Sequence, residues 1–202
     1  MRHLITTLVL IVLARPPAAT AAGPETMGPL APHIDLDPQG TPWRVVEEQG
    51  RLVVENSSEA GRVTYYFVEP QERPVAVSVS VTVTGAGQEL SGAGLLYALQ
   101  GEGQARLYYL FILSPDGTTS VLRRDTSGVS RMIATRVPDL DPSGPVELRV
   151  EEAGGAAGFF VNAEQVGTIQ AEGVGSGAVG VAAAGEGRFT FEDFQLGRAG
   201  QR

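Results

Sequence analysis

The side chains that could do chemistry in this sequence are mostly carboxylates and arginines. The chain has no Cys, and all 15 of its basic residues are Arg. Thiol nucleophiles, Cys-based zinc sites and Lys Schiff bases are therefore excluded. A Ser-His-Asp triad would need His33, because the other histidine, His3, falls in a segment that we predict to be removed. His33 lies in a Pro-rich stretch where a solvated side chain is expected, so we predict no catalytic residues and leave enzyme activity as an alternative.

The carboxylates are spaced poorly for acid–base catalysis. Glu47-Glu48 and Glu151-Glu152 are adjacent pairs, and neighbouring residues on a strand point to opposite faces. Glu192-Asp193 falls where a strand pattern changes phase, which indicates a β-bulge. The acids of 35–37 and 139–141 have the oxygen ligands that calcium prefers, but both pairs neighbour Pro, which favours a turn. We predict no cofactor, with calcium kept as an alternative.

Arginines and tyrosines in the middle of the chain form the candidate ligand site. The segment 106–136 has five arginines against two acids, a net +3, although the whole chain has a formal charge of −8. Arg pairs with carboxylate or sulfate groups, and an outward Tyr can stack on a sugar ring. The alternative is ordinary solvated charge and tyrosines that cover the edge of the core. The predicted ligand-binding residues are Tyr97, Arg106, Tyr108, Tyr109, Arg123 and Arg131.

Residues 1–22 have the pattern of a secretory signal peptide. Arg2 precedes the apolar run Leu4–Ala14, and small residues follow at 18–22 in an Ala-x-Ala arrangement. The run is shorter than the roughly 20 residues that cross a bilayer. We therefore predict a periplasmic or extracellular protein without a membrane anchor. The alternative is a buried N-terminal helix. The acidic charge also argues against nucleic acid as a partner, and the oligomeric state stays open.

The rest of the chain alternates with a period of two residues. In Val75–Thr84 every odd position is Val and every even position is Ala, Ser or Thr, which is typical of a strand with one buried face. Twelve further strands are predicted by the same pattern and by flanking turn residues. They are Trp43–Glu47, Arg51–Asn56, Arg62–Val68, Ala93–Leu99, Leu107–Leu113, Thr118–Arg124, Arg131–Val137, Val146–Glu151, Gly158–Val161, Gln165–Ile169, Ala178–Ala183 and Arg188–Leu196.

Thirteen short strands without helices predict an all-β protein, a two-sheet antiparallel jelly-roll β-sandwich. The expected organisation is a signal peptide at 1–22, a Pro- and Gly-rich lead-in at 23–42, the sandwich at 43–197 and a tail at 198–202. Five prolines in the lead-in predict an extended tether, with a short first strand at 33–36 as an option.

Several segments resemble the concanavalin-A-like lectin and glucanase superfamily. They include Gly92–Tyr97, Tyr108–Phe111, Phe159–Asn162, Gly177–Val181 and Phe191–Leu196. The chain looks most similar to laminin-G-like modules and to exported bacterial domains of the 3-keto-disaccharide hydrolase type. The Glu-x-Asp-x-x-Glu string of glycanases with this fold does not occur here.

The resemblance implies three possible functions. The first is a non-catalytic exported module that binds a carbohydrate, such as an anionic glycan, or another cell-envelope ligand weakly. In that case Val75–Thr84 would form the floor of a concave sheet, and the predicted Tyr and Arg residues would form its wall. The second is a structural or protein-interaction module. The third is a glycoside hydrolase of the 3-keto-disaccharide type.

Overall fold

The computed structural model describes residues 27–57, 62–69, 75–85, 91–170 and 177–198. The predicted signal peptide at 1–22 lies outside these residues, as do 23–26 of the lead-in and 199–202 of the tail. Across the described ranges, no helix combines the length and the apolar character needed to cross a membrane.

Within the described residues the chain forms thirteen strands and two short 3-10 helices. Each predicted strand is present, with its ends moved by at most a few residues. The helices are η1 (Gly28–His33) and η2 (Gly103–Ala105). The strands are β1 (Trp43–Glu48), β2 (Arg51–Asn56), β3 (Val63–Val68), β4 (Val75–Thr84), β5 (Gly92–Gln100), β6 (Leu107–Leu113), β7 (Thr118–Asp125), β8 (Gly128–Arg136), β9 (Val146–Ala153), β10 (Ala156–Val161), β11 (Glu164–Gln170), β12 (Ala178–Ala184) and β13 (Gly187–Arg198).

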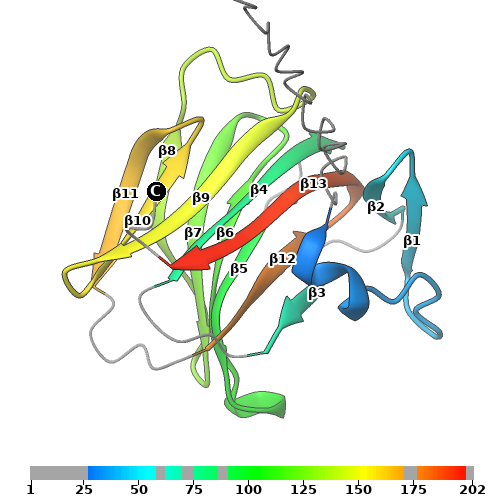
Figure 1. Ribbon diagram of the computed structural model, residues 1–202, viewed down its shortest axis with the longest axis horizontal. Helices are drawn as coiled ribbons and strands as arrows, with labels where there is room; N and C mark the ends of the chain where they lie inside the picture. Colours follow the sequence, from blue (N-terminus) through cyan, green and yellow to red (C-terminus); the bar gives the residue numbers. More distant parts are fainter. Residues whose placement is uncertain (1–26, 58–61, 70–74, 86–90, 171–176, 199–202) are drawn as a thin grey trace, which may run out of the picture.

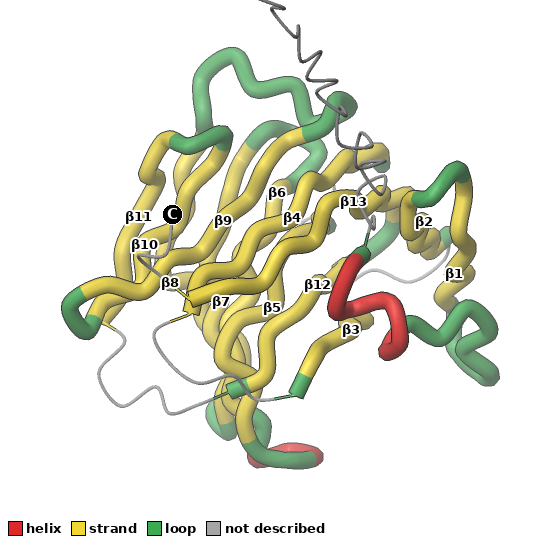
Figure 2. Tube along the Cα trace, viewed as in Figure 1, coloured by secondary structure: helices red, strands yellow, loops and turns green. Residues whose placement is uncertain are grey.

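The strands form two sheets that lie face to face (Figures 1 and 2). The seven-stranded sheet has the order β1-β2-β13-β4-β9-β10-β11, and the six-stranded sheet has the order β3-β12-β5-β6-β7-β8. All neighbouring strands whose register is known run antiparallel. The predicted all-β, two-sheet antiparallel jelly-roll sandwich is confirmed.

The core between the sheets follows the period-two pattern. All five valines of β4 are buried and alternate with small residues that are partly buried or, at Thr84, exposed, so β4 has one apolar face, as predicted. On β13, Phe189, Phe191 and Phe194 are all buried. They share a face because the register shifts between Glu192 and Gln195 and Asp193 has a φ of 55°. The predicted bulge at Glu192-Asp193 is therefore confirmed.

The lead-in differs from the predicted tether. Residues 28–33 form η1, and the optional first strand at 33–36 is not present. Leu30 on η1 is fully buried and belongs to the main core, together with Met27. The helix packs on β13 and β3, one strand from each sheet, so it covers one side of the sandwich. At the other side, the Thr135 hydroxyl of β8 donates a hydrogen bond to the Val166 carbonyl of β11 at 3.4 Å.

Candidate ligand-binding site

The middle strands of the six-stranded sheet carry apolar residues on both faces. Leu95, Phe111 and Val121 belong to the main core, whereas their neighbours Leu96, Leu110 and Leu122 belong to a second, separate cluster. Because successive strand residues point to opposite faces, the second cluster lies on the outer face of this sheet. Its buried members are Leu96, Leu99, Leu110, Ile112, Leu122, Ala178 and Ala182. A fully solvated sheet face would carry mainly polar residues, whereas this outer face has a buried apolar cluster.

Two tyrosines lie over this second cluster and reveal the shape of the face. Tyr65 of β3 and Tyr108 of β6 pack against it, and their ring centroids are 5.8 Å apart. Strands β12 and β5 lie between β3 and β6, which corresponds to about 14 Å in a flat sheet. Rings attached to strands this far apart can meet only if the sheet curves toward its outer face. We therefore call this face the concave face.

Tyr65, Phe67, Tyr108 and Arg106 form an aromatic patch on the concave face. The Phe67 ring lies 5.9 Å from that of Tyr65. Arg106 donates a hydrogen bond to the Tyr65 hydroxyl, and its guanidinium lies 5.7 Å from the centre of the same ring. A guanidinium at this distance from a ring makes a cation–π contact. The patch therefore holds aromatic surface and hydrogen-bonding groups side by side.

The pKa of Tyr108 depends on its burial and on the neighbouring Tyr65, Arg106 and Arg124 side chains. Burial raises the pKa of Tyr108, and the nearby Tyr65 hydroxyl raises it further, while Arg124 and Arg106 act in the opposite direction. The net shift is upward, so the hydroxyl stays neutral at physiological pH and can donate a hydrogen bond. Arg124 also lines a small hollow of about 60 Å³ with Tyr108, Leu110 and Leu122. The site can thus offer rings, a hydroxyl donor and guanidinium groups to a ligand.

The structure does not bring the six predicted ligand-binding residues into one site. Arg106 and Tyr108 belong to the aromatic patch, and Arg131 lies opposite Leu122 at the edge strand of the same sheet. Tyr97 and Tyr109 instead point into the main core, where they are 1% and 7% exposed. Arg123 lies opposite Tyr109 and pairs with Asp125 at 3.3 Å.

Tyr97 is part of a buried polar contact. Its hydroxyl donates a hydrogen bond to Glu152 Oε1 at 2.5 Å, and the Val75 amide donates to Glu152 Oε2 at 3.1 Å. Glu152 is buried, while its neighbour Glu151 is only partly buried and pairs with Arg149 on the outer face of the seven-stranded sheet. The predicted opposite orientation of this adjacent acidic pair is confirmed. Tyr97 therefore contributes to the core and is not available to stack on a ligand.

The predicted floor of the site is wrong. Strand β4 (Val75–Thr84) lies in the seven-stranded sheet, and its small side chains lie on the outer face of that sheet. The predicted wall residues lie in the six-stranded sheet, on the other side of the core. The floor of the concave face is formed instead by the leucines of the second cluster. Alternation identified the buried face of β4 correctly, but it carries no information about which sheet a strand joins.

The sequence prediction also missed members of the site. Tyr65, Phe67 and Arg124 were not among its residues, although the pattern predicts that one tyrosine of Tyr65-Tyr66 faces outward. Tyr66 is buried and Tyr65 is the outward one. The same holds for the second pair, where Tyr109 is buried and Tyr108 is outward. Choosing the outward member of both pairs would have needed the parity of the flanking core residues, such as Phe111 and Val68.

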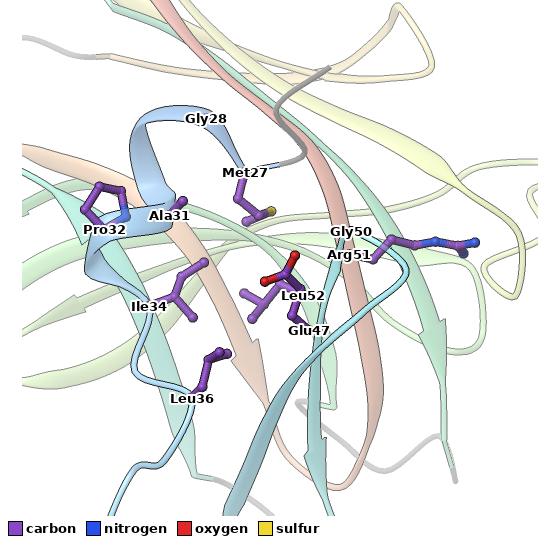
Figure 3. A pocket seen from close by; sticks show the side chains of 10 residues that line it. All are labelled: Met27, Gly28, Ala31, Pro32, Ile34, Leu36, Glu47, Gly50, Arg51 and Leu52. Atoms are coloured by element: carbon purple, nitrogen blue, oxygen red, sulfur yellow. The ribbon is translucent and has the colours of Figure 1, made fainter. Parts of the chain in front are cut away.

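A second hollow lies between the lead-in and the β1–β2 hairpin (Figure 3). This cleft has a volume of about 500 Å³, and its lining includes Ile34, Leu36 and Leu52. Figure 3 shows Arg51 extending away from these apolar side chains, and Arg51 Nε lies 3.7 Å from a carboxylate oxygen of Glu192. None of the ten residues that line the cleft is aromatic. It therefore suits a carbohydrate less well than the aromatic patch does.

The acidic turns do not assemble into a metal site within the described residues. Asp35 accepts a hydrogen bond from the Asp37 amide at 3.0 Å, and Asp141 accepts one from the Ser143 amide at 2.9 Å. Both acids therefore stabilise turns, as predicted. No group of three or more His, Cys, Asp or Glu side chains gathers closely enough in the described ranges to hold a metal ion. The prediction of no cofactor, with calcium as an alternative, remains untested.

Solved structures identify the fold. The carbohydrate-binding module CBM66 from Bacillus subtilis matches with a TM-score of 0.54 and 11% identity, over 77% of this chain and 95% of that one. A Bacillus subtilis protein of unknown function with a galectin-like fold matches with a TM-score of 0.56 and 11% identity, over 76% and 85%. The exoplasmic/lumenal domain of VIP36, in a form with Ca2+ and Man3GlcNAc, matches with a TM-score of 0.54 and 12% identity, over 77% and 81%.

The fold is that of the galectin-like and concanavalin-A-like β-sandwiches. The predicted resemblance to the concanavalin-A-like superfamily is confirmed at this level of fold. No protein-family model and no curated protein matches the sequence. The narrower likeness to laminin-G-like or 3-keto-disaccharide hydrolase-like domains therefore stays a prediction.

Proposed function

We propose that this chain is an exported, non-catalytic module that binds a carbohydrate weakly on the concave face of its six-stranded sheet. The observation that carries the proposal is the aromatic patch, in which Tyr65, Phe67 and Tyr108 lie within 6 Å of a neighbouring ring beside Arg106. Aromatic faces bind the apolar side of a sugar ring, while hydroxyl and guanidinium donors bind its oxygens. The similarity to a carbohydrate-binding module and to a lectin domain is consistent with this role.

The outer face of the seven-stranded sheet provides a useful contrast. It also holds an aromatic ring beside an arginine, because Arg149 lies 4.2 Å from the centre of the Phe160 ring. There the guanidinium is neutralised by Glu151, and the ring stands without an aromatic partner among the described residues. Phe160 is thus a matched control for the aromatic patch.

The positions of the acids favour binding over hydrolysis. Glu151 and Glu192 lie opposite Ala76 and Ser80 of β4, on the outer face of the seven-stranded sheet. Glu152 is buried in the core. None of these three carboxylates faces the aromatic patch, so a sugar bound there would not meet them. Hydrolysis of the 3-keto-disaccharide type therefore gains no support from these residues.

Replacing both tyrosines of the patch with alanine should weaken carbohydrate binding at least about fivefold, because each ring contributes roughly 0.5–1.5 kcal/mol beyond its buried area. The full-length gene is expressed, and the protein is purified in whatever form the cell produces and is screened on a glycan array. Dissociation constants for the positive glycans are then measured by calorimetry for the wild type, Tyr65→Ala/Tyr108→Ala and Phe160→Ala.

A control variant and a more conservative tyrosine variant separate a local effect on the binding site from a loss of folding. Phe160→Ala should bind as the wild type does. Tyr65→Phe/Tyr108→Phe keeps both rings and should lose less affinity than the alanine variant, which separates stacking from hydrogen bonding if the alanine variant is unstable. Equal losses in Phe160→Ala and the tyrosine variant would refute the site, and an array without any bound glycan would refute the proposed function.

Exposed apolar side chains favour a protein-interaction module as the second candidate. Val63 and Phe67 on β3 and Val129 and Met132 on β8 are all at least 36% exposed. Both strands are edges of the six-stranded sheet, and exposed apolar groups at sheet edges can mark partner surfaces. If this candidate is right, the glycan array is blank, and Val129→Ser/Met132→Ser weakens the capture of a protein partner.

A further inference from the structure

Eight arginines of the described residues fall into two groups by their ionic partners. On the seven-stranded sheet, Arg44, Arg51, Arg149 and Arg188 each pair with a carboxylate. Arg44 contacts Glu55 at 2.7 Å, Arg51 contacts Glu192 at 3.7 Å and Arg188 contacts Glu48 at 2.6 Å, while Arg149 pairs with Glu151. Their positive charges are therefore balanced within the sheet.

Four arginines on or directly before strands of the six-stranded sheet differ from these, with Arg106 just before β6 and the others on β7 and β8. Arg106, Arg124, Arg131 and Arg136 have no carboxylate oxygen within 4.0 Å in the part of the chain that the structure describes. The register places Arg124 opposite Tyr108, Arg131 opposite Leu122 and Arg136 opposite Thr118. Tyr108 and Leu122 belong to the concave face, and Thr118 shares their parity on β7. Arg124, Arg131 and Arg136 thus lie on the concave face, and Arg106 joins them through its contact with Tyr65.

Such a group of cations is unusual in a chain with a formal charge of −8. Two acids lie in the segment 106–136. Asp116 accepts hydrogen bonds from Thr118, the residue opposite Arg136. The pKa of Asp125 is lowered by hydrogen bonds from Ser127 and, to a smaller degree, by Arg123 and Arg124. Asp125 forms its ion pair with the inward Arg123 and so offsets Arg124 only in part. Like charges on neighbouring strand positions repel one another. Their positive potential therefore remains available to an external anion.

We propose that the concave face selects anionic glycans, with carboxylate or sulfate groups, over neutral ones. This inference rests on the proposed carbohydrate-binding function and names its ligand class. Arg106 and Arg124 bind the acidic group of a sugar whose ring lies on Tyr65 and Tyr108, since guanidinium groups fit carboxylate and sulfate bidentately. Arg131 and Arg136, about 16 Å apart along β8, extend the contact, so the ligand is a chain of several sugars.

The test measures affinity for polygalacturonate, for heparin and for neutral galactan by affinity electrophoresis and calorimetry with the full-length protein. We expect the acidic polymers to bind at least about tenfold more tightly than galactan at 50 mM salt, and this preference to shrink at about 300 mM because salt screens exposed charges. Polygalacturonate and heparin distinguish a carboxylate from a sulfate as the preferred group.

Matched arginine variants locate the effect. Arg106→Gln/Arg124→Gln should lose at least about tenfold in affinity for the preferred acidic polymer. Arg44→Gln/Arg51→Gln changes the net charge equally on the other sheet and should stay within about twofold of the wild type. Arg106→Lys/Arg124→Lys retains the charges and should lose less, which keeps the test valid if the Gln variant does not fold.

Three results would overturn the inference. Equal affinity for neutral and acidic polymers would refute it while leaving the proposed function intact. Equal losses in the two Gln variants would show that the effect is one of net charge alone. If neither acidic nor neutral glycans bind, the proposed function fails together with the inference.

Discussion

Leu30→Ala is expected to lower the free energy of unfolding by about 2–5 kcal/mol, as is usual for a fully buried leucine. Leu30 lies on η1, where it is 0% exposed and contacts the main core. The smaller side chain would leave a cavity between the two strands, β13 and β3, on which the helix packs. Urea denaturation of the wild type and the variant measures the difference, with an unchanged dependence on urea concentration.

Leu36→Ala is the matched control, because Leu36 belongs to the same lead-in but is 50% exposed. It should change the unfolding free energy by less than about 0.5 kcal/mol. An equally small effect of Leu30→Ala would contradict the docking of η1. The lead-in would then be the extended tether that its prolines predict. The cleft would no longer be lined by the residues of the lead-in.

Tyr97→Phe is expected to destabilise the protein by about 1.5–3 kcal/mol, the usual contribution of a hydrogen bond to a charged group. The variant keeps the ring, which packs edge-on against Phe159 with the centroids 6.4 Å apart, but removes the hydroxyl donor to the buried carboxylate of Glu152. Thermal and urea unfolding measure the loss of stability.

Tyr109→Phe serves as the control for this experiment. Tyr109 is also buried, and its ring lies 6.1 Å from that of Tyr97. Among the described residues, its hydroxyl has no hydrogen-bond partner. Its replacement should change stability by less than about 0.5 kcal/mol. If Tyr97→Phe were equally harmless while glycan binding fell, Tyr97 would belong to the ligand site after all.

The fold could be predicted from the sequence because its signals are local. Alternation in Val75–Thr84 identifies a half-buried strand without any tertiary information, and the change of parity after Phe191 identifies the bulge. The lead-in could not be predicted in the same way. Proline disfavours an α-helix, yet η1 is a short 3-10 helix with Pro29 near its start and Pro32 inside. Its stability comes from the burial of Leu30, a tertiary contact that has no local pattern.

The candidate site could be predicted only in part because it depends on which strands become neighbours. Arg106 and Tyr108, two of the predicted ligand-binding residues, both lie in the aromatic patch. Tyr65 lies 41 residues before Arg106 and 43 before Tyr108, and it joins them because β3 belongs to the same six-stranded sheet. Tyr97 faces the core with Leu95, where its hydroxyl contacts Glu152, 55 residues away in sequence. Alternation does not give the order of strands that brings Tyr65 to Tyr108, whereas the shared parity of Tyr97 and Leu95 does indicate that Tyr97 faces the core.

The central claim is that a carbohydrate binds on the concave face of the six-stranded sheet. The most direct test follows the backbone amide NMR signals of the ¹⁵N-labelled protein during titration with pentagalacturonate and with a neutral galactan pentasaccharide. We predict that chemical-shift changes concentrate around Tyr65, Tyr108 and Arg124, while the amide signals around Phe160 on the other sheet do not change. Shifts that cluster at Phe160 or at the cleft around Arg51, or no shifts up to about 10 mM of either sugar, would contradict the account.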